Sequence, residues 1–358
     1  MRKALFPIFL SVLLVLTMFF VVSSNSEVVS WWPAEGNAND IVGTNHGTLE
    51  NGATFAPGIV GLAFSFDGVD DFVNLGRPTN LQLQTLSVSA WVKPTSMPNA
   101  PLGILSYGVP SWAIGVEGYF DGDVYFGADG LAGVSTGAYK LPLNVWTHVA
   151  ATSQDNGGLK TVKIYINGEE MPLTLTNNDY PLPLNLDFQF DDPTKQNLGL
   201  GGTWQWWVSR WGNYFPGLID EVKVYNRALS SQEIQAIYNE VMKVMASIDI
   251  DPNTLNLKSN GEWITAYITL PEGHSVEDID VNTVLLKHHD FELPADWSVV
   301  EAPPVVLTIK FDRATLRDYL GEVDVDDGEK FYDITLTVTG SVAGTPFEGS
   351  DTITVKRK

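Results

Sequence analysis

One stretch of sequence decides the fold: Gly217-Leu218-Ile219-Asp220-Glu221-Val222-Lys223-Val224-Tyr225-Asn226-Arg227-Ala228-Leu229-Ser230. Apolar and polar residues alternate up to Tyr225, which is typical of a strand with one buried face. A helix start follows directly, because Ser230 or Ser231 can cap the helix and Glu233 lies in its first turn. Two acids, Asp220 and Glu221, fall in the middle of the predicted strand.

Working outward, residues 27–229 contain many short apolar runs separated by Gly, Pro and Asn. One run ends at Asn167-Gly168, a strong signal for a two-residue hairpin turn. Regular short strands with such turns predict an antiparallel sandwich or barrel. The texture changes near Ser247, where a second set of period-two strands begins. We therefore predict an all-β chain with two sandwich domains, at residues 27–245 and 246–358, joined by the helix that follows Ser230.

The first 26 residues are predicted to be a secretory signal peptide. Arg2 and Lys3 form a basic start, residues 4–22 are almost wholly apolar, and small residues at 24–26 suit cleavage. The apolar run is also long enough for an uncleaved membrane anchor, which stays open as an alternative. After cleavage no membrane span is expected, and the protein is predicted to be secreted, extracellular or on the cell surface.

Composition excludes several kinds of chemistry and partner. The chain has no cysteine, so thiol catalysis, Cys-ligated zinc and lipid attachment to cysteine are ruled out. Its formal net charge is −22. A surface this acidic repels nucleic acid and anionic membranes, so we expect neither as a partner.

The first predicted domain resembles the laminin-G-like, concanavalin-A-type jelly roll. The resemblance rests on the stretch quoted above, on residues 64–73, and on five further segments in the family's order, at residues 32–38, 45–49, 86–94, 146–150 and 164–168. It implies an antiparallel jelly roll in which the first and last strands run side by side. It also implies a binding domain for carbohydrate or glycoconjugate rather than an enzyme.

The second predicted domain resembles a β-sandwich module of bacterial and archaeal secreted proteins, with immunoglobulin-like proportions. The matching segments are residues 248–252, 255–259, 278–284, 309–313 and 347–353. We interpret it as a spacer or docking module.

No catalytic motif is present in the sequence. Glucanases on this scaffold need paired carboxylates on one strand, with the pattern Glu-x-Asp-x-x-Glu, and that string does not occur. The five histidines lack zinc-site spacing, and there is no Gly-x-Ser-x-Gly nucleophile elbow. We therefore predict a protein that is not an enzyme.

Calcium is the predicted cofactor. Side-by-side first and last strands would bring Glu35 or Asp40 close to Asp220 or Glu221, and clustered carboxylates favour a hard cation. The alternative is that Asp220 or Glu221 points outward or caps a turn. A second acidic set is formed by Asp67, Asp70 and Asp71, for which the simpler interpretation is a tight turn between strands.

An aromatic cluster just before the closing strand is the predicted ligand site. Exposed indole rings can stack on the apolar face of a sugar while neighbouring polar groups bind its hydroxyls. The alternative is an aromatic corner of the core or an interface patch. The candidate residues are Trp204, Trp206, Trp207, Arg210, Trp211, Asn213 and Tyr214, and further rim candidates are Tyr107, Trp112, Tyr119 and Tyr125.

Together these features predict a secreted or cell-surface, non-catalytic protein that binds carbohydrate or a surface glycan through the jelly roll. One alternative is a structural or adhesive surface protein that contacts other proteins. A weaker one is an accessory protein of a glycoside hydrolase system.

Overall fold

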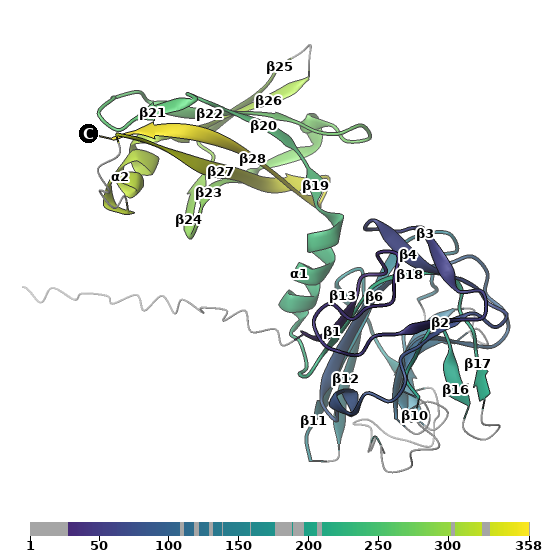
Figure 1. The fold of residues 1–358 in the computed structure, drawn as a ribbon. Helices are drawn as coiled ribbons and strands as arrows, with labels where there is room; N and C mark the ends of the chain where they lie inside the picture. Colours follow the sequence, from purple (N-terminus) through teal and green to yellow (C-terminus); the bar gives the residue numbers. More distant parts are fainter. Residues whose placement is uncertain are drawn as a thin grey trace, which may run out of the picture.

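The computed structural model describes residues 28–107, 111–117, 122–128, 132–137, 139–157, 159–175, 188, 197–205, 210–301, 305–323 and 330–357. The described strands form two β-sandwiches, and helix α1 lies between them (Figure 1). The predicted signal peptide, together with Trp206, Trp207 and Tyr119, lies outside the described residues. Within them, no helix has the length and apolar character needed to cross a bilayer.

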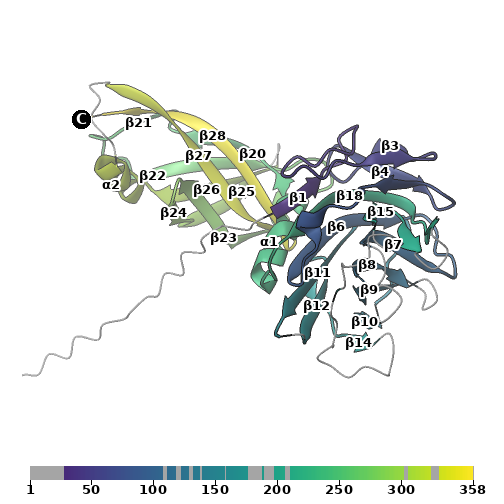
Figure 2. The same ribbon diagram turned by 60° about the horizontal axis from the view of Figure 1, so that its bottom comes forward.

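The first sandwich is a jelly roll of two eight-stranded antiparallel sheets that face each other (Figure 2). One sheet runs in the order β13 (Glu169–Glu170), β12 (Lys160–Ile166), β11 (Thr147–Asp155), β6 (Leu86–Pro94), β18 (Pro216–Tyr225), β4 (Leu62–Asp67) and β3 (Thr54–Pro57), with β1 (Val28–Trp32) also paired to β18. The other runs β14 (Thr174–Leu175), β10 (Ala132–Ser135), β9 (Asp123–Ala128), β8 (Trp112–Glu117), β7 (Pro101–Ser106), β15 (Gly199–Leu200), β5 (Phe72–Asn74) and β2 (Thr48–Glu50).

Strand β18 is the strand that the alternating stretch predicts, and it pairs with β1, β4 and β6. Its first half pairs with β4, where Ile219 faces Phe64, and its second half pairs with β1, where Tyr225 faces Val28. The change of partner falls at Asp220 and Glu221, where the register with β6 shifts and Glu221 adopts a φ of 51°. The two acids therefore occupy a β-bulge, which adds twist and redirects side chains.

Helix α1 (Ser231–Met242) is capped by Ser230, one of the two predicted caps. The Ser230 side chain accepts a hydrogen bond from the Glu233 backbone N–H, while the Glu233 carboxylate accepts one from the Ser230 backbone N–H, which completes a capping box. Ile234 is fully buried against the outer face of the first sheet, next to Tyr165 and Tyr225. The helix thus covers the outer face of a sheet whose inner face already lines the sandwich core.

The second sandwich also has two sheets. One runs β19 (Val244–Met245), β28 (Thr345–Lys356), β27 (Phe331–Val342), β23 (Ile279–His288) and β24 (Phe291–Pro294), with β21 (Thr254–Asn256) beside β28. The other runs β20 (Ser247–Asp251), β22 (Trp263–Thr269), β26 (Val306–Asp312) and β25 (Trp297–Glu301), and helix α2 (Arg313–Val323) follows β26.

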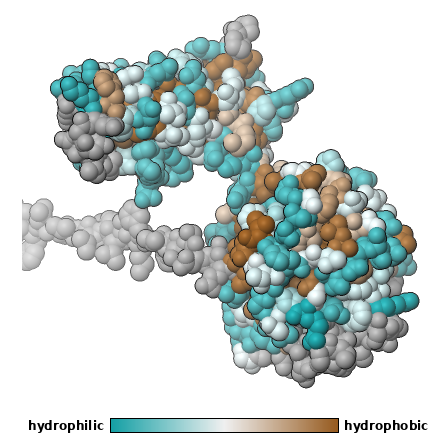
Figure 3. Space-filling model, in the orientation of Figure 1, coloured by the Kyte–Doolittle hydropathy of each residue, from teal (hydrophilic) through white to brown (hydrophobic). Residues whose placement is uncertain are grey.

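The two sandwiches have separate hydrophobic cores. The buried residues of the first core end with Val224, and those of the second begin with Val244. On the face seen in Figure 3, hydrophilic and hydrophobic residues are intermixed on both sandwiches.

Candidate functional site

A pocket of about 770 Å³ opens at one edge of the first sandwich, beside the small hairpin formed by β16 (Thr203–Gln205) and β17 (Arg210–Gly212). Five of the predicted ligand-site residues line it, from this hairpin and from the segment after it. They are Trp204, Arg210, Trp211, Asn213 and Tyr214. A second wall comes from strands β2 and β5 and from the β2–β3 and β4–β5 connections, with Glu50, Asn51, Val69, Asp70, Phe72 and Asn74.

The aromatic rings of this pocket support one another. Trp204 and Trp211 are cross-strand partners whose ring centroids lie 5.5 Å apart at 74°, an edge-to-face arrangement. Trp211 also packs on Phe72, with centroids 4.4 Å apart. An added Cβ at Gly199 would lie only 2.3 Å from the Trp211 ring, so the bare backbone there makes room for the indole. Both tryptophans are half-buried, with one part of each held by the fold and another facing the pocket.

Polar groups surround the rings. Gln205 donates a hydrogen bond from its Nε2 to the Asn213 Oδ1 at 3.0 Å, which fixes the Asn213 amide. Partial burial raises the pKa of the Tyr214 hydroxyl, and the nearby Asp70 carboxylate raises it further, so the phenol is a neutral donor and acceptor. Arg210 is exposed at the edge of the hairpin. A ligand in this pocket would meet both aromatic surface and hydrogen-bonding groups.

Several rim candidates belong to the core instead. Tyr107 and Trp112 are fully buried, and Tyr125 is 6% exposed. The Trp112 indole N–H donates to the Leu81 carbonyl, and the Tyr107 hydroxyl donates to the Pro78 carbonyl. Tyr107 and Trp112 pack in the sandwich core, whereas Tyr125 alternates with the core residues Val124 and Phe126 and so lies on the other face of the sheet. None of the three lines the pocket, so the expectation that they form its rim is wrong.

The four predicted calcium ligands take different roles. Asp40 is buried, and its carboxylate accepts hydrogen bonds from the backbone N–H groups of Trp31, Val42, Gly43 and Asn45. Burial alone would raise the pKa of Asp40, but these donors together hold it below its usual value. Asp40 therefore shapes its own loop.

Glu221 and Asp220 differ in their partners. The Glu221 carboxylate lies 3.2 Å from the Lys223 ammonium, which itself packs over the Trp31 ring. Asp220 has no exposed surface, and its Oδ2 accepts hydrogen bonds from the Ile59 and Val60 backbone N–H groups. Burial raises the pKa of Asp220 to about 7, with the Glu221 carboxylate contributing in the same direction.

Glu35 faces the same loop as Asp220. Its carboxylate accepts a hydrogen bond from the Leu62 N–H and lies against Gly61, while the Asp220 carboxylate lies against Gly58. Of the four predicted ligands, Glu35 and Asp220 are thus brought to one short loop, whereas Asp40 and Glu221 are engaged elsewhere.

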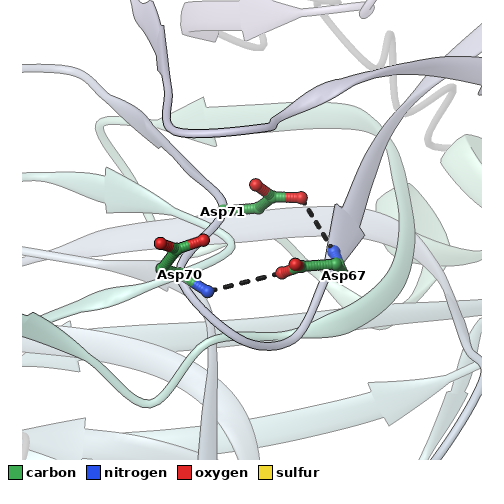
Figure 4. A group of neighbouring side chains, drawn as sticks. All are labelled: Asp67, Asp70 and Asp71. Carbon is green, nitrogen blue, oxygen red and sulfur yellow. Dashed lines mark hydrogen bonds between the residues drawn. The ribbon is translucent and has the colours of Figure 1, made fainter.

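The acids Asp67, Asp70 and Asp71 form the one group of three potential metal-ligating side chains among the described residues (Figure 4). The Asp67 carboxylate accepts hydrogen bonds from the Val69 and Asp70 N–H groups, the first of which is the main cause of its lowered pKa. Asp71 accepts from the Gly52 and Asp67 N–H groups. These bonds are those of a tight turn, the simpler interpretation of this sequence.

The wall formed by Asn51, Asp70 and Phe72 was not predicted as part of the ligand site. These residues lie more than a hundred positions before the aromatic cluster, and no local pattern connects the two segments. The only available signal was the resemblance of residues 64–73 to the family, which places this turn beside the closing strand.

Comparison with known proteins agrees with the fold. Residues 67–235 match the family described as the concanavalin A-like lectin/glucanases superfamily. None of the curated proteins matches the sequence.

Three solved structures illustrate the similarity. Domain 4 of AbnA, an extracellular arabinanase from Geobacillus stearothermophilus solved with arabinotriose, is 23% identical over 59% of this chain and 98% of that one, with a TM-score of 0.45. A mutant Trypanosoma rangeli sialidase is 14% identical over 59% of this chain and 32% of that one, with a TM-score of 0.43. The binding domain of botulinum neurotoxin DC, solved with rat synaptotagmin II, is 11% identical over 90% and 73%, with a TM-score of 0.43.

Proposed function

Taking the match of residues 67–235 to the concanavalin A-like lectin/glucanases superfamily as a premise, we propose that this protein is a secreted or cell-surface, non-catalytic carbohydrate-binding protein. The observation that carries the proposal is the pocket beside the β16–β17 hairpin. There, two half-buried indoles stand next to the Tyr214 hydroxyl, the Asn213 amide and the Arg210 guanidinium.

The chemistry of this pocket suits a sugar better than an apolar ligand. A pyranose or furanose ring offers one apolar face of C–H groups, which stacks on an indole, and a rim of hydroxyls that both donate and accept hydrogen bonds. Asn213 and Tyr214 can each donate and accept, and Arg210 can donate to two oxygens at once. The pocket is also held in shape by packing of Trp211 on Phe72, so little ordering is needed on binding.

The test is a glycan array probed with the full chain, followed by titration of the best ligand against Trp204→Ala. We expect the variant to lose at least about tenfold in affinity, because it removes one stacking face. Trp297→Ala is the matched control, since Trp297 is an exposed tryptophan on the second sandwich, and its loss should leave binding unchanged.

Two results would count against this proposal. If no glycan binds, the alternative of a surface protein that contacts other proteins is favoured. If a glycan binds but Trp204→Ala leaves its affinity unchanged, the sugar site lies elsewhere on the molecule.

We also propose a structural calcium ion at the loop of residues 58–62, held by Glu35 and Asp220. Support comes from the two carboxylates that contact this loop, Glu35 at Gly61 and Asp220 at Gly58, and from the raised pKa of Asp220, since a buried carboxylate is stabilised by a nearby cation. The ion would neutralise Asp220 and tie the first strand region to the last strand.

A further inference from the structure

A second pocket of about 630 Å³ adjoins the one beside the hairpin. It is lined by Asn51, Gly52, Thr54, Ser65, Phe66, Asp67, Asp70 and Asp71. Asn51 and Asp70 line both pockets. The two hollows therefore meet at these residues, with β16 and β17 beside the first and β3 and β4 beside the second.

The junction between the pockets is held in a fixed shape. The Asn51 side-chain amide donates a hydrogen bond to the Asp70 backbone carbonyl, and the Gly52 N–H donates to the Asp71 Oδ1 at 2.6 Å. These bonds tie the β2–β3 connection to the β4–β5 turn. The turn is itself constrained, because Gly68 has a φ of +79° and an added Cβ there would meet Pro216 at 2.5 Å. A bound ligand would thus find a continuous, preformed surface.

The charge of this surface is strongly one-sided. Four carboxylates line the two pockets, from Glu50, Asp67, Asp70 and Asp71, and Arg210 is the single basic residue among the lining residues. The second pocket is lined by three aspartates and no basic residue. Figure 4 shows the three aspartates gathered around the turn. An anionic ligand would be repelled along most of this length, whereas an uncharged one would find acceptors for its hydroxyls.

On the premise of the proposed function, we infer that the two pockets form one groove for an uncharged oligosaccharide. One sugar unit stacks at Trp204 and Trp211, and the following units lie along Thr54, Ser65 and the aspartates. The first pocket alone falls within the range of about 300–1,000 Å³ that is usual for ligand sites. It is therefore large enough to bind sugar by itself, and the second pocket provides space for further units of a longer chain. Glycans with carboxylate or sulfate groups are excluded by the acidic wall.

The first test is chain length. We would titrate neutral arabino-, xylo- and cello-oligosaccharides of two to six units, after the array has shown which series binds. We expect affinity to rise at least tenfold between two and four units. Thr54→Tyr should bring this ratio of long to short close to one, because an aromatic side chain at an exposed strand position fills the second pocket.

The second test is charge. Oligogalacturonides and sialyllactose should bind at least tenfold more weakly than the neutral series. Asp70→Asn should raise the ratio of acidic to neutral affinity severalfold, since it removes one charge at the junction while keeping the shape of the side chain. Asp249→Asn, which removes an exposed charge on the second sandwich, is the control and should leave that ratio unchanged.

The results separate this inference from the function on which it rests. If no carbohydrate binds at all, the proposed function fails. If carbohydrate binds at Trp204 but affinity does not grow with chain length, or acidic glycans bind as well as neutral ones, only the groove inference is overturned.

Discussion

His148 shows how a single buried residue can set the pH range of this fold. It lies on β11 with 1% of its surface exposed, and neither ring nitrogen has a hydrogen-bond partner among the described residues. The ring packs against Trp91 of β6 and Tyr238 of helix α1, with centroids at 5.4 and 6.1 Å, and those two rings also stack on each other. Burial lowers the pKa of His148 to about 3, and the positive charge of Lys223 acts in the same direction.

We predict that His148 contributes a loss of stability to the first sandwich as pH falls below about 6.5, opposite in sign to the contribution of Asp220. The unfolded chain binds a proton at His148 near that pH, but the folded chain does not until about pH 3, so protonation favours unfolding across this window. By pH 5 the loss from this residue amounts to about 2 kcal/mol. Urea unfolding at pH 7 and pH 5 measures it. His148→Leu should remove this part of the pH dependence. If the free energy of unfolding changes between pH 7 and pH 5 by the same amount in the wild type and the variant, the prediction is wrong.

Among the elements, β18 combines the most predictable and the least predictable features. Its alternation is plain in the sequence, and its pairing with the strand of Phe64 is confirmed. The bulge at Asp220 and Glu221 has no comparable signal. The two adjacent acids interrupt the alternation, but such a break does not by itself distinguish a bulge from a polar pair at an exposed part of the strand. Side-chain direction near the bulge, and thus which acids meet, follows from backbone geometry rather than from composition.

One of the two proposed calcium ligands, Asp220, lies in this bulge. Calcium added to chelator-treated protein should raise the melting temperature of the first sandwich by about 5–10 °C at a hundredfold excess over Kd, since only the folded state binds it. The folded state holds extra protons at Asp220 between about pH 4 and pH 7, so the contribution of Asp220 to stability without metal falls as pH rises through that window, opposite to the contribution of His148. Because the ion competes with the proton, its effect should be larger at pH 8 than at pH 5.

Isosteric variants separate the ligands from the loop-shaping acid. Glu35→Gln combined with Asp220→Asn should abolish the calcium response. Asp40→Asn should lower stability, since it weakens four backbone hydrogen bonds, yet keep the response. A calcium response that survives the double variant would remove these two residues from the site.

The segment that contains Trp204 and Trp211 could be predicted only in part from the sequence. A cluster of tryptophans indicates burial or binding, but the two outcomes depend on which sheet face each ring occupies. Trp211 is both partly buried and open to a ligand, because one side packs on Phe72 and the other lines the pocket. Its partner wall at Asn51 and Asp70 comes from a distant part of the chain, and only the fold brings it near.

At the scale of the whole molecule, the second sandwich has its own hydrophobic core and is expected to fold independently of the first. Its core shares no residue with the first, and Val244 on β19 is its first buried member. We predict that residues 244–358, expressed alone, unfold in one cooperative transition in urea. A fragment that begins at residue 247 should be less stable by about 1.5–3 kcal/mol, because it lacks the buried Val244 and the pairing of β19 with β28. A fragment without a cooperative transition would refute the domain division.

The position of β18 has a consequence for how the chain reaches its native state. Val28 pairs with Tyr225, so the N-terminal strand has no permanent neighbour until nearly the whole jelly roll has been synthesised. Contacts between residues this distant in sequence form slowly, and unpaired strand edges are exposed in the meantime. Folding of this domain is thus expected to be post-translational and limited by the arrival of its last strand.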